Sequence, residues 1–129
     1  MLNLYGNGVN LTERTLDYLW GRQTVTQQNI ANVDTPGYKQ QFVTFENALG
    51  KSIRAAQLQN APAKAIQRAI DHSHLQLHTT RNESTRLDGN NVDMDQEQVE
   101  LVKTTYEYQH MVQSINNDFR RLQNAVKSF

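Results

Sequence analysis

Three histidines lie close together in the middle of the chain and are the residues best suited to chemistry: His72, His74 and His78. On a helix, His74 and His78 would share one face, and imidazole nitrogens spaced in this way can bind a metal ion. On a strand, all three would lie on one side. Asp71 is the nearby carboxylate, but the segment shows little periodicity and would position ligands poorly. We therefore expect solvated histidines, with no metal, no cofactor and no catalytic residue; a metal-dependent enzyme is the alternative.

Four carboxylates form a second group of candidate ligands: Asp93, Asp95, Glu97 and Glu100. A calcium loop of the EF-hand type needs glycine at its sixth position and glutamate at its twelfth, and this segment has neither. Acidic side chains are favoured near a helix N-terminus, where backbone N–H groups are unpaired. We therefore expect these residues to begin a helix.

Five tyrosines could stack on nucleic acid: Tyr5, Tyr18, Tyr38, Tyr106 and Tyr108. Such binding also needs a basic groove, but the chain has 13 Lys and Arg residues against 13 Asp and Glu residues. With a net charge of zero it has no field to attract a polyanion. We expect no nucleic-acid binding and predict that the tyrosines pack in a core or an interface. The lack of cysteine excludes disulfides and thiolate zinc sites.

Helical periodicity is clearest in the last third of the chain, residues 92–129. Asp93 and Gln96 have the spacing of a capping box, which predicts a helix from Asp93 to Phe129. Its seam positions alternate four and three residues apart: Leu101, Thr105, Tyr108, Val112, Ile115, Phe119, Leu122, Val126 and Phe129. A long helix with one narrow apolar seam needs a partner helix.

The N-terminal region, residues 1–39, offers that partner. A helix is expected from about Asn10 to Val33, with Asn10 or Thr12 as its cap. Its seam has the same spacing: Val9, Thr12, Leu16, Leu19, Gln23, Thr26, Ile30 and Val33. We predict a mainly all-α fold in which the two terminal helices pack as a coiled-coil hairpin. Leu16, Leu19 and Ile30 would face the seam of the C-terminal helix.

Residues 40–91 read as a variable and partly irregular central insert. Helical spacing continues for a short distance through Phe42, Phe45, Leu49 and Ile53. From Ala55 to Arg86 the pattern fades, which suggests a small peripheral subdomain or a segment that is not ordered in the free monomer. Leu75 and Leu77 alternate with polar residues, as on a short strand, and residues 87–91 contain the Asp-Gly signal of a turn.

Bulk properties point toward folding on assembly. Hydrophobic residues make up 37% of the chain, and the mean hydropathy is −0.73. No run approaches the ~18 apolar residues of a membrane span, so no membrane insertion is expected. The first eight residues lack the basic region and apolar core of a cleavable signal. We therefore expect any export to use another route.

Two short motifs are more specific than these patterns. The first is Asn-Ile-Ala-Asn-Val-Asp-Thr-Pro-Gly-Tyr-Lys, residues 29–39, in which Pro36 ends a helix and Gly37 permits a tight turn. The second is Asp-Gly-Asn-Asn-Val-Asp, residues 88–93, which opens the C-terminal helix.

Both motifs resemble those of the bacterial flagellar axial proteins, the rod and hook family. The resemblance covers about the first 45 and the last 40 residues, and the short length is similar to that of a proximal rod protein rather than a hook protein. It assigns two sets of motif residues. The turn motif is Asn29, Ala31, Asn32, Thr35, Pro36, Gly37 and Tyr38, which would fix the turn against neighbouring subunits. The helix-start motif is Asp88, Gly89, Asn90, Asn91, Val92 and Asp93.

The resemblance implies a non-enzymatic subunit of the proximal rod of the flagellar basal body, polymerising into the drive shaft that transmits motor torque. Such proteins are exported through the flagellar type III apparatus and would lie in the periplasmic rod. Their implied partners are other rod proteins, the MS-ring protein and the adaptor between ring and rod. A soluble helical adaptor or export chaperone is the alternative function.

Overall fold

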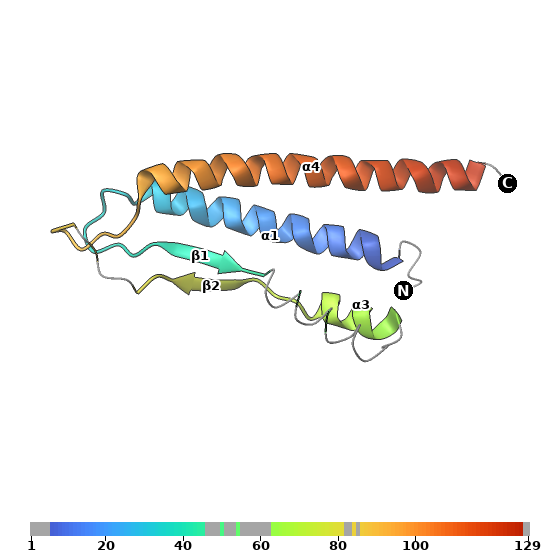
Figure 1. Ribbon diagram of the computed structural model, residues 1–129, viewed down its shortest axis with the longest axis horizontal. Helices are drawn as coiled ribbons and strands as arrows, with labels where there is room; N and C mark the ends of the chain where they lie inside the picture. Colours follow the sequence, from blue (N-terminus) through green and yellow to red (C-terminus); the bar gives the residue numbers. More distant parts are fainter. Residues whose placement is uncertain are drawn as a thin grey trace.

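The computed structural model describes residues 6–45, 50, 54, 63–81, 84 and 86–127. Its elements in chain order are α1 (Gly6–Ala31), β1 (Gln41–Thr44), α3 (Ala63–Asp71), β2 (Gln76–Thr79) and α4 (Met94–Lys127). Helices α1 and α4 pack against each other and run antiparallel, and the β1–β2 pair with α3 lies on the other side of α1 (Figure 1). The predicted helical hairpin with a small central insert is therefore confirmed.

Helix α1 carries two buried stripes because it is the middle layer. The predicted seam positions Thr12, Leu19 and Thr26 are buried. A second stripe that the periodicity did not predict includes Tyr18 and Val25, which lie on the side of the β1–β2 pair. The helix begins at Gly6 rather than near Asn10, so the proposed cap at Asn10 or Thr12 is wrong. The Thr12 hydroxyl instead donates to the Gly8 carbonyl inside the helix, at 3.0 Å.

The segment after α1 forms a strand, not the helix suggested by the spacing of Phe42 and Phe45. Strand β1 pairs antiparallel with β2, with Phe42 opposite His78 and Val43 opposite Leu77. A separation of three residues fits a helix, but here the β-branched Val43 and Thr44 lie in the strand and Phe45 follows it. The strand predicted near Leu77 is confirmed. Leu49, Ile53 and residues 55–62 lie outside the described residues.

A small core joins α1 to the insert. Phe45 stacks on Tyr18 with ring centroids 5.4 Å apart, and Ile70 of α3 is buried beside them with Leu19. Helix α3 thus occurs where the sequence pattern faded. A helix of 9 residues has too few turns to show a clear repeat.

Helix α4 begins at Met94 with Asp93 as its cap, as predicted, but it buries a stripe rotated from the expected seam. The Asp93 carboxylate accepts hydrogen bonds from the N–H groups of Asp95 and Gln96, at 3.0 and 3.3 Å. Thr104 is fully buried where the seam pattern placed Thr105, whose hydroxyl bonds within its own helix. The observed stripe runs through these buried or half-buried positions: Glu97, Leu101, Thr104, Tyr108, Met111, Ile115 and Asp118. Leu101, Tyr108 and Ile115 are common to both stripes, and Val112 is half-buried next to them.

The last turns of α4 extend past the start of α1 (Figure 1). Of the predicted seam residues in this part of α4, Val126 is 76% exposed, whereas Phe119 and Leu122 are 38% and 39% exposed, and Leu122 lies near Gly8 and Val9 of α1. Phe129 and Tyr5 lie outside the described residues. No helix in the described part of the chain is both long and apolar enough to cross a membrane.

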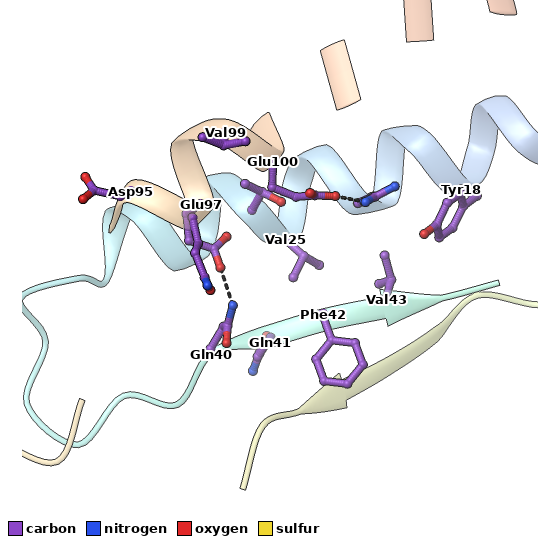
Figure 2. A pocket seen from close by; sticks show the side chains of 13 residues that line it. Tyr18, Val25, Gln40, Gln41, Phe42, Val43, Asp95, Glu97, Val99 and Glu100 are labelled. Carbon is purple, nitrogen blue, oxygen red and sulfur yellow. Dashed lines mark hydrogen bonds and ion pairs between the residues drawn. The ribbon is translucent and has the colours of Figure 1, made fainter. Parts of the chain in front are cut away.

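A charged cluster joins the middle of the two helices. The guanidinium of Arg22 in α1 forms ion pairs with Glu100 and Glu107 of α4, the second at 3.5 Å, and lies 5.8 Å from the centre of the Tyr18 ring. Figure 2 shows Glu100 reaching toward α1. The two glutamates are seven residues apart and flank the buried stripe, so Arg22 fixes the register of one helix against the other.

Candidate functional site

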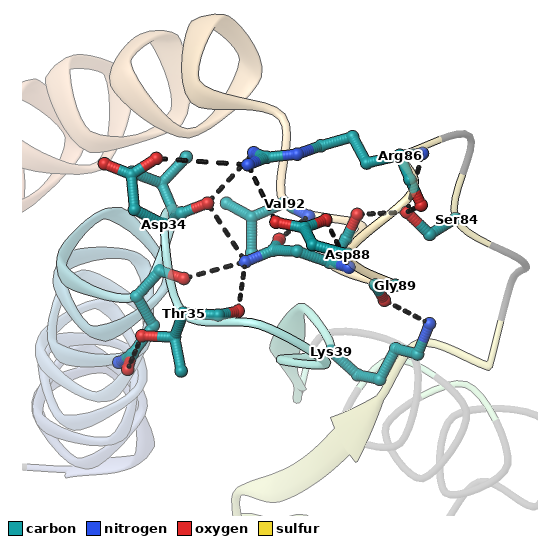
Figure 3. Close-up of polar contacts among 11 residues, drawn as sticks. Asp34, Thr35, Lys39, Ser84, Arg86, Asp88, Gly89 and Val92 are labelled. Carbon is teal, nitrogen blue, oxygen red and sulfur yellow. Dashed lines mark hydrogen bonds and ion pairs between the residues drawn. The ribbon is translucent and has the colours of Figure 1, made fainter.

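The two sequence motifs, fifty residues apart in the chain, meet at one end of the molecule (Figure 3). We call this region the motif junction: residues 29–41 together with Ser84 and residues 86–93. The Gly37 N–H donates to the Asp88 carbonyl at 2.8 Å. Gly37 and Gly89 have φ angles of 73° and 77°, and a Cβ on Gly89 would lie 3.7 Å from the Gly37 Cα. Both turns thus use glycine because the backbone is left-handed where the two segments approach.

Asn90 is the centre of the junction, with none of its surface exposed. Its side-chain amide donates to the carbonyls of Asn32, Val33 and Thr35, at 2.9, 3.0 and 2.9 Å. Its side-chain oxygen accepts from the Val92 N–H at 2.8 Å. Helix α1 ends at Ala31, so these three carbonyls belong to the turn that follows it, and Asn90 supplies each of them with a partner. Asn90 therefore holds that turn from the other motif.

Asn29 ties the end of α1 to the first residue of β1. It is 1% exposed, and its amide donates to the Gln41 carbonyl at 2.7 Å, while its oxygen accepts from the Gln41 N–H at 3.0 Å. The same oxygen accepts from the Tyr38 hydroxyl at 3.3 Å. Burial, and secondarily the charge of Glu97, raise the pKa of Tyr38, so the phenol stays protonated and can donate.

Two basic side chains brace the junction from outside. The Lys39 ammonium donates to the Gly89 carbonyl at 2.7 Å. The Arg86 guanidinium donates to the Val33 carbonyl at 2.9 Å and pairs with the Asp88 carboxylate at 3.0 Å. Charged donors to carbonyl oxygens make stronger hydrogen bonds than neutral ones. Lys39 and Arg86 therefore hold the turn between α1 and β1 against the segment that leads into α4.

A third set of bonds connects the junction to the first turn of α4. The Gln40 N–H donates to the Asn91 side-chain oxygen, and the Gln40 side-chain amide donates to Glu97, both at 2.6 Å. Glu97 is 4% exposed. The junction is thus a polar clamp: side-chain amides join the end of α1, the start of β1 and the start of α4.

The structure divides the predicted motif residues into two groups. Asn29, Asn32, Tyr38 and the residues of the helix-start motif make bonds inside the junction or cap α4. Four turn-motif residues are exposed on its outer side, Ala31, Thr35, Pro36 and Gly37, although backbone groups of Thr35 and Gly37 also bond within the junction. Contact between this motif and neighbouring subunits stays a prediction, and these four residues are the ones whose exposed surface suits it.

Several residues of the site were missed from the sequence: Lys39, Gln40, Arg86 and Glu97 at the junction, and Arg22 with Glu107 between the helices. The ion pairs of Arg22 could have been predicted. Glu100 and Glu107 stand next to the seam positions Leu101 and Tyr108, which is where charged residues of coiled coils pair between helices. For the junction residues no local spacing signals a partner fifty positions away.

A groove opens beside the junction between α1, β1 and the start of α4 (Figure 2). It has a volume of about 630 Å³, and Val25, Val43 and Val99 supply apolar surface. Its carboxylates are Asp95, Glu97 and Glu100. The groove is thus apolar with an acidic margin.

None of the three candidate histidines lines the groove or belongs to the junction, although His78 contacts the groove residue Phe42. His78 is on β2, where its Nε2 is 2.8 Å from the Thr44 hydroxyl and its ring stacks on Phe42. His72 and His74 precede the strand and are exposed. Among the residues that the structure describes, no group of three histidine, aspartate or glutamate side chains could hold a metal ion.

Comparison with known proteins gives relatives along the whole chain. The flagellar basal body rod protein FlgB of Borrelia hermsii is 32% identical over 135 residues, covering 98% of this chain and 100% of its own. The FlgB proteins of Bacillus subtilis and Escherichia coli are 28% and 27% identical over 125 and 140 residues, covering 97% and 99% of this chain and the same shares of their own. No family model matches the chain.

Proposed function

Because this chain belongs to the FlgB family of flagellar basal body rod proteins, we propose that it is a structural subunit that polymerises into the proximal rod and transmits motor torque. The similarity to these relatives over nearly the full length of both chains carries the proposal. The matched length spans the segments that form the two long helices and the junction.

The architecture supports a load-bearing role. Torque on a rod subunit acts across its long axis, and α1 and α4 run along that axis (Figure 1). The motif junction prevents them from separating at one end, and the Arg22 cluster opposes sliding at their middle. A hairpin fastened in this way resists bending and shear better than two helices joined by a loop alone.

Its partners in this proposal are other rod proteins, the MS-ring protein and the adaptor protein between ring and rod. The subunit would reach the periplasmic rod through the flagellar type III apparatus, without a cleaved signal peptide. The low hydrophobic content supports this route, because a chain with a small core is easily kept unfolded for export.

The test is deletion of the gene in its own bacterium, with electron microscopy of basal bodies, a swimming assay and rescue from a plasmid. We expect cells that lack hooks and filaments, and restoration of both by the wild-type gene. Purified basal bodies from the rescued cells should contain the chain. Intact rods that lack the chain, in cells that nevertheless fail to swim, would instead support the helical adaptor or export chaperone.

A further inference from the structure

Asp88 and Gly89 form a chemically labile pair. In an unfolded chain, the backbone nitrogen of the glycine can attack the side-chain carboxyl carbon of the aspartate before it. A C–N bond forms, a C–O bond breaks, and the N–H proton leaves with the carboxyl OH as water, which gives a five-membered succinimide. Water then opens this ring to aspartate or to isoaspartate. Glycine favours the attack, because it has no Cβ near its nitrogen and its backbone rotates freely.

The motif junction fixes the peptide group that joins the pair (Figure 3). The Gly89 N–H donates to the Arg86 carbonyl at 3.1 Å, and the Asp88 carbonyl accepts from the Gly37 N–H at 2.8 Å. This peptide group is therefore bonded at both its nitrogen and its oxygen. Ring closure requires it to rotate, so that the nitrogen turns toward the aspartate side chain, and the rotation would break both bonds.

The carboxylate of Asp88 is held as well. One of its oxygens pairs with the Arg86 guanidinium at 3.0 Å, and the other accepts from the Asn90 N–H at 3.1 Å. On the far side of the glycine, the Lys39 ammonium donates to the Gly89 carbonyl at 2.7 Å. The carboxyl carbon would have to leave both of its partners to reach the glycine nitrogen. Both reacting groups are thus engaged elsewhere in the folded chain.

We propose that Asp88 is a modification site whose reactivity is controlled by folding. The junction blocks succinimide formation in the folded chain, whereas the unfolded chain converts Asp88 to isoaspartate with water as the sole co-reactant. This inference stands apart from the proposed function, because it concerns the chemistry of one residue pair in the isolated chain.

The modification would also prevent a chain from returning to this fold. Isoaspartate places one additional carbon atom in the main chain between positions 88 and 89, and so displaces Asn90. The Asn90 amide is fully buried and donates to three carbonyls of the turn after α1. A displaced amide would leave these buried groups unpaired, which is costly. Isomerised chains should therefore be lost from the folded population.

Peptide mapping of the full-length chain tests the protection. Wild-type protein is incubated at neutral pH with and without guanidinium chloride, and isoaspartate at position 88 is identified by chromatography and electron-transfer fragmentation of its peptide. We expect it to form at least about tenfold faster in the denaturant, because ring closure in the folded chain first requires the junction to open locally. Equal rates in the two conditions would overturn the proposal.

Two variants separate the junction from folding in general. Arg86→Met removes one partner of the Asp88 carboxylate and should speed isomerisation of the folded chain about threefold, a modest factor because the Arg86 side chain is 42% exposed. Arg22→Met is the control, since it weakens the contact between α1 and α4 but leaves the bonds of Asp88 intact. Each rate is divided by that of the same variant in guanidinium chloride, which removes any direct effect of the substitution on the chemistry. Equal acceleration in both variants would show that the junction is not the shield.

Refolding tests the consequence of the modification. Aged, unfolded wild-type chain is returned to native buffer, and size-exclusion chromatography separates the refolded chain from the chain that stays expanded. We expect isoaspartate at position 88 to be depleted about tenfold in the refolded fraction. Asn7–Gly8 is the internal control: it forms a succinimide with loss of ammonia but lies outside the junction, so its products should divide evenly. Equal shares of isoaspartate 88 in the two fractions would contradict the proposed effect on folding.

Discussion

The two ends of the helical hairpin differ in how their surfaces are used. At the motif junction, Asn29 and Asn90 are buried and their amides are engaged within the chain. At the α4 tip, which comprises residues 118–127, Leu122 and Val126 are 39% and 76% exposed, and the segment contains Arg120, Arg121 and Lys127. One end therefore defines the shape of the subunit, while the other leaves surface for a partner.

The largest expected effect comes from Asn90→Asp at the junction. The carboxylate has the same shape but would face three carbonyl oxygens without a donor, so we expect a loss of about 3 kcal/mol or more in the free energy of unfolding. Urea denaturation of the full chain measures it. The control is Asn116→Asp, an exposed position on α4, for which a change below about 0.5 kcal/mol is expected. Similar losses in both variants would mean that the junction is not a stabilising clamp.

The next largest effect tests the middle of the hairpin. Arg22→Met keeps an unbranched apolar stem but leaves Glu100 and Glu107 without their shared cation. It should cost about 2 kcal/mol in the free energy of unfolding, since the Arg22 side chain is only partly exposed. Arg14→Met is the matched control, because Arg14 forms only a surface pair with Asp17 at 4.0 Å. Thermal unfolding of the two variants should therefore differ; equal melting temperatures would remove the role given to Arg22.

Backbone conformation provides the third comparison. Gly89→Ala places a Cβ on a residue with φ of 77° and should destabilise by about 1–2 kcal/mol. Gly8→Ala, inside α1 with open space where the added methyl group would lie, should stabilise by about 0.4–1 kcal/mol. Chemical denaturation distinguishes the opposite signs, and a neutral Gly89→Ala would show that the turn can change its conformation.

A smaller effect is expected at Tyr38. Tyr38→Phe removes a hydrogen bond to Asn29 and should cost about 1 kcal/mol at neutral pH. Since the pKa of Tyr38 is raised in the folded state, its contribution is complete below the pKa of an unfolded tyrosine and is lost as the pH rises through the folded-state pKa. The wild type should therefore lose more stability on alkaline titration than Tyr38→Phe. Tyr106→Phe, at an exposed site, is the control, and parallel curves for wild type and Tyr38→Phe would contradict the account.

The smallest effect on the isolated chain is expected at the tip. Val126→Ala should change the free energy of unfolding by less than about 0.5 kcal/mol, because the side chain is exposed. Swimming and rod yield should fall in cells nevertheless, if the tip serves assembly. A large loss of stability in the isolated chain would place Val126 in the fold rather than at an interface.

The sequence predicted the elements better than their contacts. The two helices, the Asp93 cap and the strand near Leu77 followed from periodicity and capping chemistry. The second stripe of α1, through Tyr18 and Val25, did not, since a helix in a middle layer has apolar positions on two sides and a single-seam pattern selects only one. Phe42 and Phe45 were misread for a related reason: a spacing of three is compatible with a helix and with a strand end.

The candidate site was predicted in parts but not as a whole. Both motifs were singled out, and the left-handed glycine at position 37 followed from its turn. The contact between the two motifs depends on side-chain amides that bond to backbone groups far away in the chain. One example is the bond from the Asn90 amide to the Thr35 carbonyl. Such bonds have no period and no charge pattern, so only the folded structure can reveal them.

Amide hydrogen exchange along the isolated full-length chain would decide whether the two ends of the hairpin differ as described. The account predicts slow exchange for Gly37, Gln41 and Val92, whose N–H groups are bonded inside the junction, and fast exchange through the α4 tip. Fast exchange at the junction, or protection at the tip equal to that of the junction, would contradict it.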